Sequence, residues 1–161
     1  MEEILEILEK DARSSPEDIA KMLKRKPQDV KTAIRKYEKD GVILKYKAVI
    51  NKDLLKSEPY GLRALIEVSI TPQKDAGFDR IAERIYSFPE VSSCYLISGT
   101  YDLLVIVEGK NIHTVSSFVA EKLSCLEHVR GTTTHFLLKK YKEDGVILKQ
   151  KEENKRIAIS Y

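Results

Sequence analysis

The turn between the second and third predicted helices limits the fold of this 161-residue chain more than any other feature of the sequence. Apolar residues recur at helical spacing over residues 2–12, 16–24 and 27–40. Ser15 is a typical N-cap, and Pro16 and Pro27 occupy places typical of the first helical position. Only about three residues separate the last two helices, so they cross steeply, as in a helix-turn-helix.

The residues after the third predicted helix favour a wing. Gly41 suits the left-handed position just beyond a helix end. The apolar and β-branched run from Val42 to Asn51 then predicts a strand pair. Residues 1–51 are therefore expected to form a winged helix-turn-helix domain.

Basic charge is concentrated in this domain. Residues 20–47 hold ten basic and three acidic side chains, whereas residues 1–19 hold two basic and seven acidic ones. A basic block beside an acidic one indicates a local anion-binding surface. Spacings of three and four place one polar stripe on the outside of the third helix, made of Gln28, Lys31, Thr32, Arg35 and Lys39. Arginine and glutamine can pair with base edges, and lysine and threonine can reach phosphates, so the stripe predicts DNA recognition. The alternative is an ordinary amphipathic helix with a solvated face.

The pattern changes after a predicted linker over residues 52–62, which contains Pro59 and Gly61. Alternation and helical spacing then predict a strand, a helix, two strands, a helix and a strand, over residues 63–71, 77–87, 91–98, 103–108, 111–125 and 129–138. This βαββαβ order is typical of a ferredoxin-like antiparallel sheet with helices on one face. The predicted fold class is therefore α+β, with a second domain over residues 63–140 and a C-terminal extension over 141–161.

One decapeptide occurs twice. Residues 36–45 read KYEKDGVILK and residues 140–149 read KYKEDGVILK, with eight of ten positions identical. The flanking residues do not match, so a duplication is not indicated. We interpret the likeness as local convergence, because Asp-Gly between apolar residues is a good turn in either context.

The sequence lacks the patterns of common catalytic and metal sites. His113, His128 and His135 fall on a predicted helix, loop and strand, and none has the spacing of a metal ligand pair. The two cysteines, Cys94 and Cys125, are expected to be small buried apolar residues in a reducing cytosol. Nucleophile-elbow, phosphate-loop and dinucleotide fingerprints are missing. No catalytic residue, metal, resident cofactor or membrane partner is therefore predicted.

Several short motifs occur together in a recognisable order. They are Asp11-Ala12-Arg13, Asp40-Gly41-Val42-Ile43, Pro89-Glu90-Val91 and Ser98-Gly99-Thr100-Tyr101-Asp102-Leu103. With the order of the two domains, they resemble the leucine-responsive/asparagine-regulator (Lrp/AsnC) family of transcription regulators over nearly the whole chain. One departure is that Lys26-Pro27 stands where the family usually has serine at the start of the recognition helix.

The resemblance implies a cytoplasmic, nucleoid-associated regulator that binds double-stranded DNA. We expect base contacts from Gln28, Thr32 and Arg35, and phosphate contacts from Lys26, Lys31, Lys36, Lys39 and Lys45. In the family, the second (RAM-type) domain joins protomers into dimers, tetramers or octamers. The sequence does not distinguish among these assemblies.

The resemblance also implies an amino-acid effector between second domains. The expected contacts are Gly99, Thr100, Tyr101 and Asp102, with Thr133 and Thr134 as secondary candidates. A glycine turn exposes backbone N–H groups to a carboxylate, and Asp102 can accept an ammonium group. The alternative is a β-hairpin turn with a capping aspartate, and threonines that are simply good strand formers.

Two other functions have to be weighed. Siroheme decarboxylases are similar in architecture, and Arg63, Arg130 and His135 could be recruited to a tetrapyrrole. The basic stripe would then have no purpose. The third possibility is a ligand-sensing partner protein that does not bind DNA.

Overall fold

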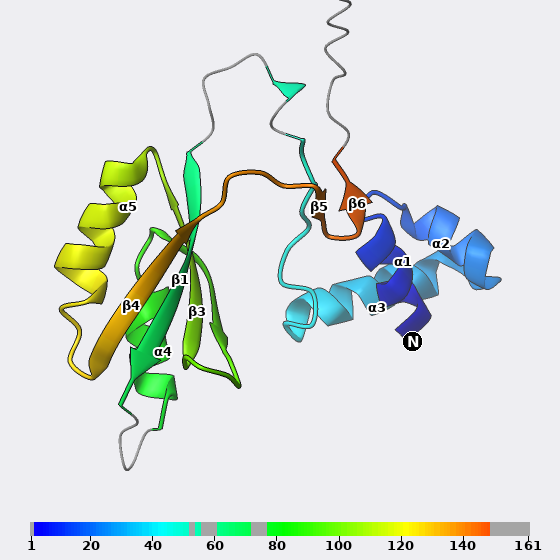
Figure 1. The fold of residues 1–161 in the computed structure, drawn as a ribbon. Helices are drawn as coiled ribbons and strands as arrows, with labels where there is room; N and C mark the ends of the chain where they lie inside the picture. Colours follow the sequence, from blue (N-terminus) through cyan, green and yellow to red (C-terminus); the bar gives the residue numbers. More distant parts are fainter. Residues whose placement is uncertain (1, 52–53, 56–60, 72–76, 149–161) are drawn as a thin grey trace, which may run out of the picture. The chain divides into compact units, whose positions relative to one another are not determined.

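A computed structural model describes residues 2–51, 54–55, 61–71 and 77–148 (Figure 1). The chain divides into two compact units, Met1–Ile50 and Asn51–Tyr161, and each is described by itself. Most of the predicted linker, residues 149–161 and the end of the second decapeptide lie outside the described residues.

Three helices form the first unit: α1 (Glu2–Lys10), α2 (Pro16–Leu23) and α3 (Pro27–Lys39). Their apolar faces meet in a small core made of Ile4, Leu8, Ile19, Ala20 and Val30. Burying an aliphatic side chain of this size contributes about 1.5–3 kcal/mol relative to leaving it exposed. The predicted three-helix order and the short turn between α2 and α3 are confirmed.

Local caps explain where these helices begin and end. The Ser15 hydroxyl accepts a hydrogen bond from the Asp18 N–H at 3.1 Å, and Pro16 and Pro27 open α2 and α3. Lys24 ends α2 in the left-handed region, at φ 52°, where glycine is usual. Gly41 follows α3 at φ 71°, as predicted.

The strand pair predicted after α3 is wrong for this structure, because residues 42–51 form no strand in the described part of the chain. The N–H groups of Val42 and Ile43 instead donate to the carbonyl of Tyr37 at the helix end. Leu44 is 87% exposed. An alternating sequence becomes a strand only where a partner supplies hydrogen bonds, and an isolated hairpin is only marginally stable.

The second unit has the predicted βαββαβ order. Its elements are β1 (Leu62–Ile70), α4 (Asp79–Tyr86), β2 (Val91–Leu96), β3 (Leu103–Gly109), α5 (Ile112–Phe118) and β4 (Val129–Phe136). The four strands form an antiparallel sheet in the order β2-β3-β1-β4. The predicted helix over 111–125 is shorter and continues as a π-helical segment, η2 (Val119–Leu123).

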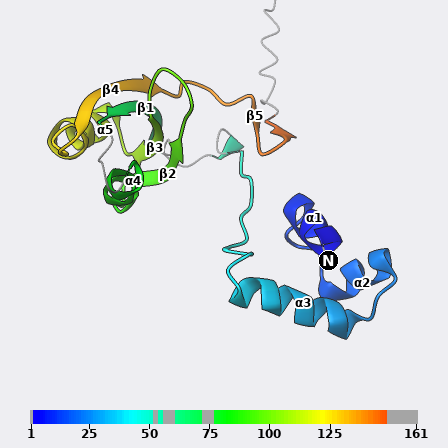
Figure 2. The ribbon, with the colours of Figure 1, turned by 90° about the horizontal axis from the view of Figure 1, so that it is seen from below.

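The two faces of the sheet differ in their partners. Ala64, Ile66, Val68 and Ile70 of β1 are buried in a core that includes side chains from α4 and α5. Both helices therefore pack on one face (Figure 2). The other face, here called the outer face, has an apolar centre in which strand register places four side chains: Leu65, Tyr95, Leu104 and Ile106.

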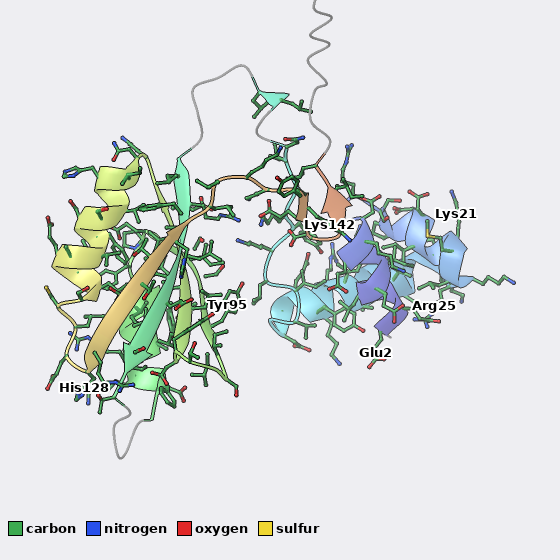
Figure 3. All side chains as sticks on the ribbon, in the orientation of Figure 1. Glu2, Lys21, Arg25, Tyr95, His128 and Lys142 are labelled. Atoms are coloured by element: carbon green, nitrogen blue, oxygen red, sulfur yellow. The ribbon has the colours of Figure 1, made fainter. Side chains whose placement is uncertain are left out.

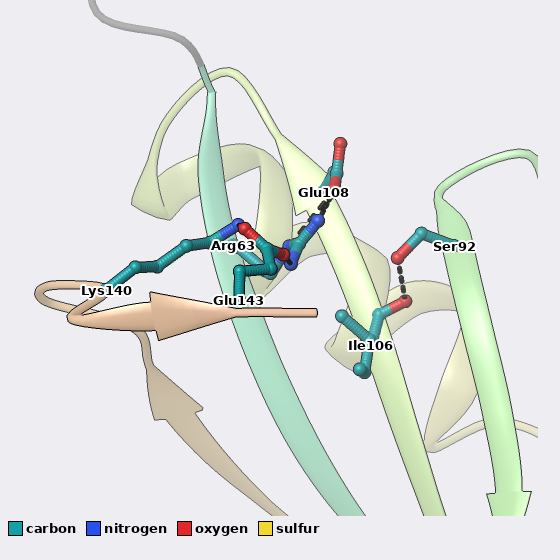
Figure 4. A network of polar contacts seen from close by, with 6 residues as sticks. All are labelled: Arg63, Ser92, Ile106, Glu108, Lys140 and Glu143. Atoms are coloured by element: carbon teal, nitrogen blue, oxygen red, sulfur yellow. Dashed lines mark hydrogen bonds and ion pairs between the residues drawn. The ribbon is translucent and has the colours of Figure 1, made fainter. Parts of the chain in front are cut away.

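A small hairpin follows the sheet, made of β5 (Lys142–Glu143) and β6 (Val146–Ile147). Asp144 and Gly145 have φ values of 46° and 79°, which is typical of a two-residue hairpin turn. Arg63 on β1 anchors the hairpin, because its guanidinium lies 2.8 Å from Glu143 and 2.7 Å from Glu108 (Figure 4). Lys140 Nζ donates to the same Glu143 carboxylate at 2.8 Å.

The repeated decapeptide thus takes two conformations. In the first copy Asp40 caps α3 and Gly41 follows the helix, whereas in the second copy Asp144-Gly145 turns a hairpin. The residues preceding Asp-Gly belong to a helix whose inner face is packed in the first case and to a strand in the second. The interpretation that Asp-Gly makes a turn in either context is confirmed for the described residues.

Candidate nucleic-acid interface and effector site

One face of α3 is fixed by the core, so the opposite face is left to solvent. Val30 is fully buried, and Ala33 and Ile34 pack against the core. The six side chains within α3 that were predicted to contact DNA are all exposed, namely Gln28, Lys31, Thr32, Arg35, Lys36 and Lys39. The helix has 13 residues. At 1.5 Å per residue, it is about 20 Å long, enough to lie along a major groove.

Thr32 is already engaged within its helix. Its hydroxyl donates to the carbonyl of Gln28 at 2.9 Å. The oxygen lone pairs and the methyl group remain on the exposed face. Thr32 can therefore accept a hydrogen bond or contact a thymine methyl group, while its proton stays within the helix.

The start of α3 carries no side-chain cap. Lys26 is the N-cap residue, and its side chain makes no capping hydrogen bond. Uncapped backbone N–H groups and the positive end of the helix dipole favour an anion such as a phosphate. The family's serine is thus replaced by a residue that contributes charge rather than a cap.

The turn before α3 adds two basic residues that the sequence analysis did not single out. Arg25 Nη2 lies 2.8 Å from Glu3 Oε2, which ties the turn to α1, and Figure 3 labels Arg25 there. Lys24 is exposed in its left-handed conformation. The sequence signal that could have drawn attention to this turn is a lysine, Lys24, at a helix end where glycine is usual.

Lys45, by contrast, lies on no strand. It is exposed in the segment that follows α3. Its neighbour Tyr46 donates from its hydroxyl to Glu38 Oε1 at 2.9 Å, which holds this segment near the end of the helix. Desolvation raises the pKa of the Tyr46 hydroxyl, and the hydrogen bond to Glu38 raises it further.

The turn between β2 and β3 gathers four of the predicted effector residues. Gly99 and Thr100 are exposed, and Tyr101 and Asp102 are half-buried. Asp102 is fixed at the end of β1: its N–H donates to the Val68 carbonyl at 3.1 Å and its Oδ2 accepts from the Ile70 N–H at 2.8 Å. The capping aspartate and the ligand-binding turn, posed as alternatives, are therefore compatible, since a second carboxylate oxygen remains.

The two secondary threonines do not join this turn. Thr133 stands opposite Glu67 on β1 and Thr134 opposite Ile66, so the two side chains lie on opposite faces of the sheet. Glu67 precedes Ile70 by three residues, a distance of about 10 Å along a strand. Within one protomer, Thr133 and Thr134 cannot share a ligand with each other.

The residues weighed for tetrapyrrole chemistry do not converge. Arg63 pairs with Glu108 and Glu143 near one end of β1, whereas Arg130 lies 3.8 Å from Asp102 near the other end. His135 Nε2 lies 3.1 Å from Glu67 Oε1. Each candidate already faces a carboxylate, so this alternative is not favoured.

The described residues contain no group of three or more His, Cys, Asp or Glu side chains that could hold a metal ion. Cys94 is half-buried, and burial raises the pKa of its thiol. Cys125 is exposed, so the prediction that it is buried is wrong. Among the described helices, none has the length and apolar character needed to span a membrane.

A helix-turn-helix with an exposed basic helix, followed by a βαββαβ domain, defines a two-domain class of DNA-binding proteins. Family models agree: a winged helix-turn-helix DNA-binding model matches residues 2–43, and the Lrp/AsnC ligand binding domain matches residues 63–147. The chain belongs to the Lrp/AsnC family and is a DNA-binding transcription regulator.

Relatives and solved structures support this assignment. The uncharacterized HTH-type transcriptional regulator YugG of Bacillus subtilis is 48% identical over 159 residues, covering 98% of this chain and 95% of YugG. The HTH-type transcriptional regulator FL11 of Pyrococcus furiosus is 29% identical, covering 87% of this chain and 88% of FL11.

Among solved structures, the regulator NMB0573 of Neisseria meningitidis, in complex with L-Met, superimposes with a TM-score of 0.68 at 26% identity. That match covers 88% of this chain and 89% of NMB0573. E. coli AsnC, at 22% identity and a TM-score of 0.65, shares the fold over 87% of this chain and 91% of its own.

Proposed function

We propose that α3 reads operator sequence in the major groove of double-stranded DNA. Gln28, Thr32 and Arg35 contact base edges. The phosphate contacts come from Lys26, Lys31, Lys36, Lys39 and Lys45. The observation that carries this proposal is that burial of Val30, Ala33 and Ile34 turns the basic stripe of the same helix to solvent.

The protein acts as a homodimer or a larger assembly built from such dimers. The outer face supports this proposal, because within the described residues of the second unit no helix packs on its apolar centre: Tyr95 is 51% exposed and lies on the opposite side of the sheet from α5 (Figure 3). Pairing two outer faces buries this centre. A two-fold dimer then presents two copies of α3 to half-sites about one helical turn, or a multiple of it, apart.

An amino acid is the proposed effector, bound at the turn Gly99–Asp102 where second domains meet. NMB0573, which is similar in fold, was solved as an L-Met complex. The free backbone of the exposed turn can receive a carboxylate, and the unengaged Asp102 oxygen an ammonium group. Thr133, on the outer face, can join only from another protomer, and Thr134 has no place in this proposal because it lies on the helix side.

A ligand at this turn changes the assembly only if it binds one assembly state more tightly than another. Asp102 connects the proposed ligand site to the sheet, because its carboxylate also accepts a hydrogen bond from the end of β1. Since its target is DNA, the protein works on the nucleoid in the cytoplasm.

The test is selection of a binding site from random DNA by the purified full chain, followed by mobility shifts of that site at several salt concentrations. A steep fall in affinity with salt and a preference over a scrambled fragment are expected. Adding each amino acid in turn then tests the effector. A chain that retains no DNA at low salt would contradict the DNA part, whereas unchanged affinity and unchanged assembly with every amino acid would contradict the effector part.

A further inference from the structure

A pocket of about 250 Å³ lies between α4 and the connection from η2 to β4. It is lined by Arg80, Ile81, Arg84, Glu127 and His128. Ile81 is 3% exposed and belongs to the core, so the pocket has a fixed apolar base and charged walls. None of these residues belongs to the proposed DNA-binding surface or to the Gly99–Asp102 turn.

The two arginines of this pocket carry charge that no carboxylate among the described residues pairs with. Arg80 and Arg84 are separated by one helical turn, so their side chains lie on the same face of α4. Neither forms an ion pair within the part of the chain that the structure describes, although Glu83 is only three residues from Arg80. Like charges at this spacing destabilise a helix, and an anion held between them removes that penalty.

His128 faces the same pocket from a fixed backbone. Its φ of 76° lies in the left-handed region, and its carbonyl accepts the Thr71 N–H at 2.9 Å. Figure 3 labels His128 near the start of β4, at the end of the sheet domain. The ring nitrogens of histidine can donate to an oxyanion, as arginine forks do.

Glu127 also lines the pocket. Its side chain is 80% exposed, and its Oε1 lies 3.8 Å from His128 Nε2. In this position the carboxylate competes with a bound anion for the imidazole. The two guanidinium groups attract a dianion more strongly than a monoanion, and solvent screens the opposing repulsion from the exposed Glu127 carboxylate. The volume is below the usual range for drug-sized ligands, which favours a small occupant.

We propose that the pocket formed by Arg80, Arg84 and His128 binds a small phosphate dianion, either free or as the ester of a small metabolite. Bidentate arginine and imidazole donors match the three terminal oxygens of such a group. The ligand is therefore chemically distinct from an amino-acid effector and occupies a different place on the second domain.

Histidine ring signals provide a local test, because all three histidines lie in the second unit and none belongs to the helix-turn-helix unit. The full chain is titrated with sodium phosphate at fixed pH, and sodium chloride maintains constant ionic strength. We expect a saturable shift of the His128 ring proton, while His113 and His135 stay in place. Glycerol phosphate, titrated in parallel, separates the two sources: tighter binding assigns an ester, and equal or weaker binding assigns free phosphate.

Matched variants complete the test. The double variant Arg80→Gln/Arg84→Gln should weaken the phosphate response at least tenfold, whereas Lys110→Gln/Lys139→Gln removes the same charge elsewhere on the domain and should keep it. Unchanged His113 and His135 signals in the first variant show that its fold is intact. A His128 shift no larger than those of His113 and His135, or one that survives the loss of both arginines, overturns the proposal.

Discussion

The carboxylate of Asp102 accepts a hydrogen bond from the backbone N–H of Ile70 at 2.8 Å. The contact joins residues 32 positions apart, and it lies where the pairing of β1 with β4 shifts register between Ser69 and Ile70. A strand end whose regular pairing is disturbed leaves a backbone donor that needs another acceptor. Asp102 therefore fixes the Gly99–Asp102 turn to the end of β1.

Two variants of Asp102 should separate its structural role from its proposed binding role. Asp102→Ala removes the acceptor for a partly buried N–H and should lower the free energy of unfolding by about 1–3 kcal/mol. Asp102→Asn keeps an oxygen acceptor but loses the charge, so it should lower stability less and still abolish an amino-acid response. Urea unfolding and effector-dependent DNA binding measure the two effects. An Asn variant with a full effector response would remove Asp102 from the ligand site.

A charge on the outer face should separate protomers. Ile106→Glu places a carboxylate at the apolar centre of the proposed interface, where burying it unpaired is costly. We expect the variant to be monomeric in light scattering at concentrations where the parent chain is a dimer or larger. Ile112→Glu is the control, since Ile112 is 59% exposed on α5, away from that face. If the Ile106 variant keeps the parent's mass and unfolding midpoint, the protomers associate elsewhere.

The hairpin anchor should weaken in acid. The hydrogen bond from Lys140 is the largest influence on Glu143, and with the bond from Arg63 it lowers the pKa of that carboxyl despite partial desolvation. A lowered folded-state pKa gives stability that is present above the ordinary glutamate pKa and is lost as pH falls through the folded value. Hydrogen exchange of the β5–β6 amides should therefore quicken below about pH 4, relative to exchange in β1.

Glu143→Gln is the control for that experiment. It should loosen the hairpin at neutral pH and remove the acid-dependent step. Protection that falls identically in both proteins would show that another group controls the hairpin.

Lys39→Ala should weaken binding to all DNA sequences about equally. Its ammonium group is expected to contact a phosphate, so the slope of log K against log salt should become shallower by about 1. Selected and scrambled fragments, measured by anisotropy over a range of salt, give the slopes. Lys110→Ala, on the second domain, is the matched control. A loss confined to the selected fragment would instead make Lys39 a base contact.

Helix starts and domain order were predictable because they depend on local chemistry. Ser15 caps α2 and Pro27 opens α3 through contacts within a few residues. The core face of β1 followed from strict alternation at Ala64, Ile66 and Val68.

Features that depend on distant partners were not predictable in the same way. The run from Val42 to Asn51 has strand composition but no strand partner among the described residues. The link from Asp102 to Ile70 joins segments far apart in sequence, and a lone Asp in a turn gives no sign of it. The two decapeptides differ for the same reason, since packing around Lys36–Lys39 and around Lys142–Glu143 selects the conformation before the shared Asp-Gly. The predicted contacts on DNA and effector remain predictions.

The central claim is that α3 reads DNA sequence, and Arg35→Ala tests it most directly. The measurement is the affinity of the full chain and of this variant for a site selected from random DNA and for a scrambled fragment of equal length. The account predicts a loss of about 1–3 kcal/mol on the selected site, relaxed preference at one base pair and little change on the scrambled fragment. A variant that keeps the parent's affinity and preference would contradict the placement of α3 in the groove.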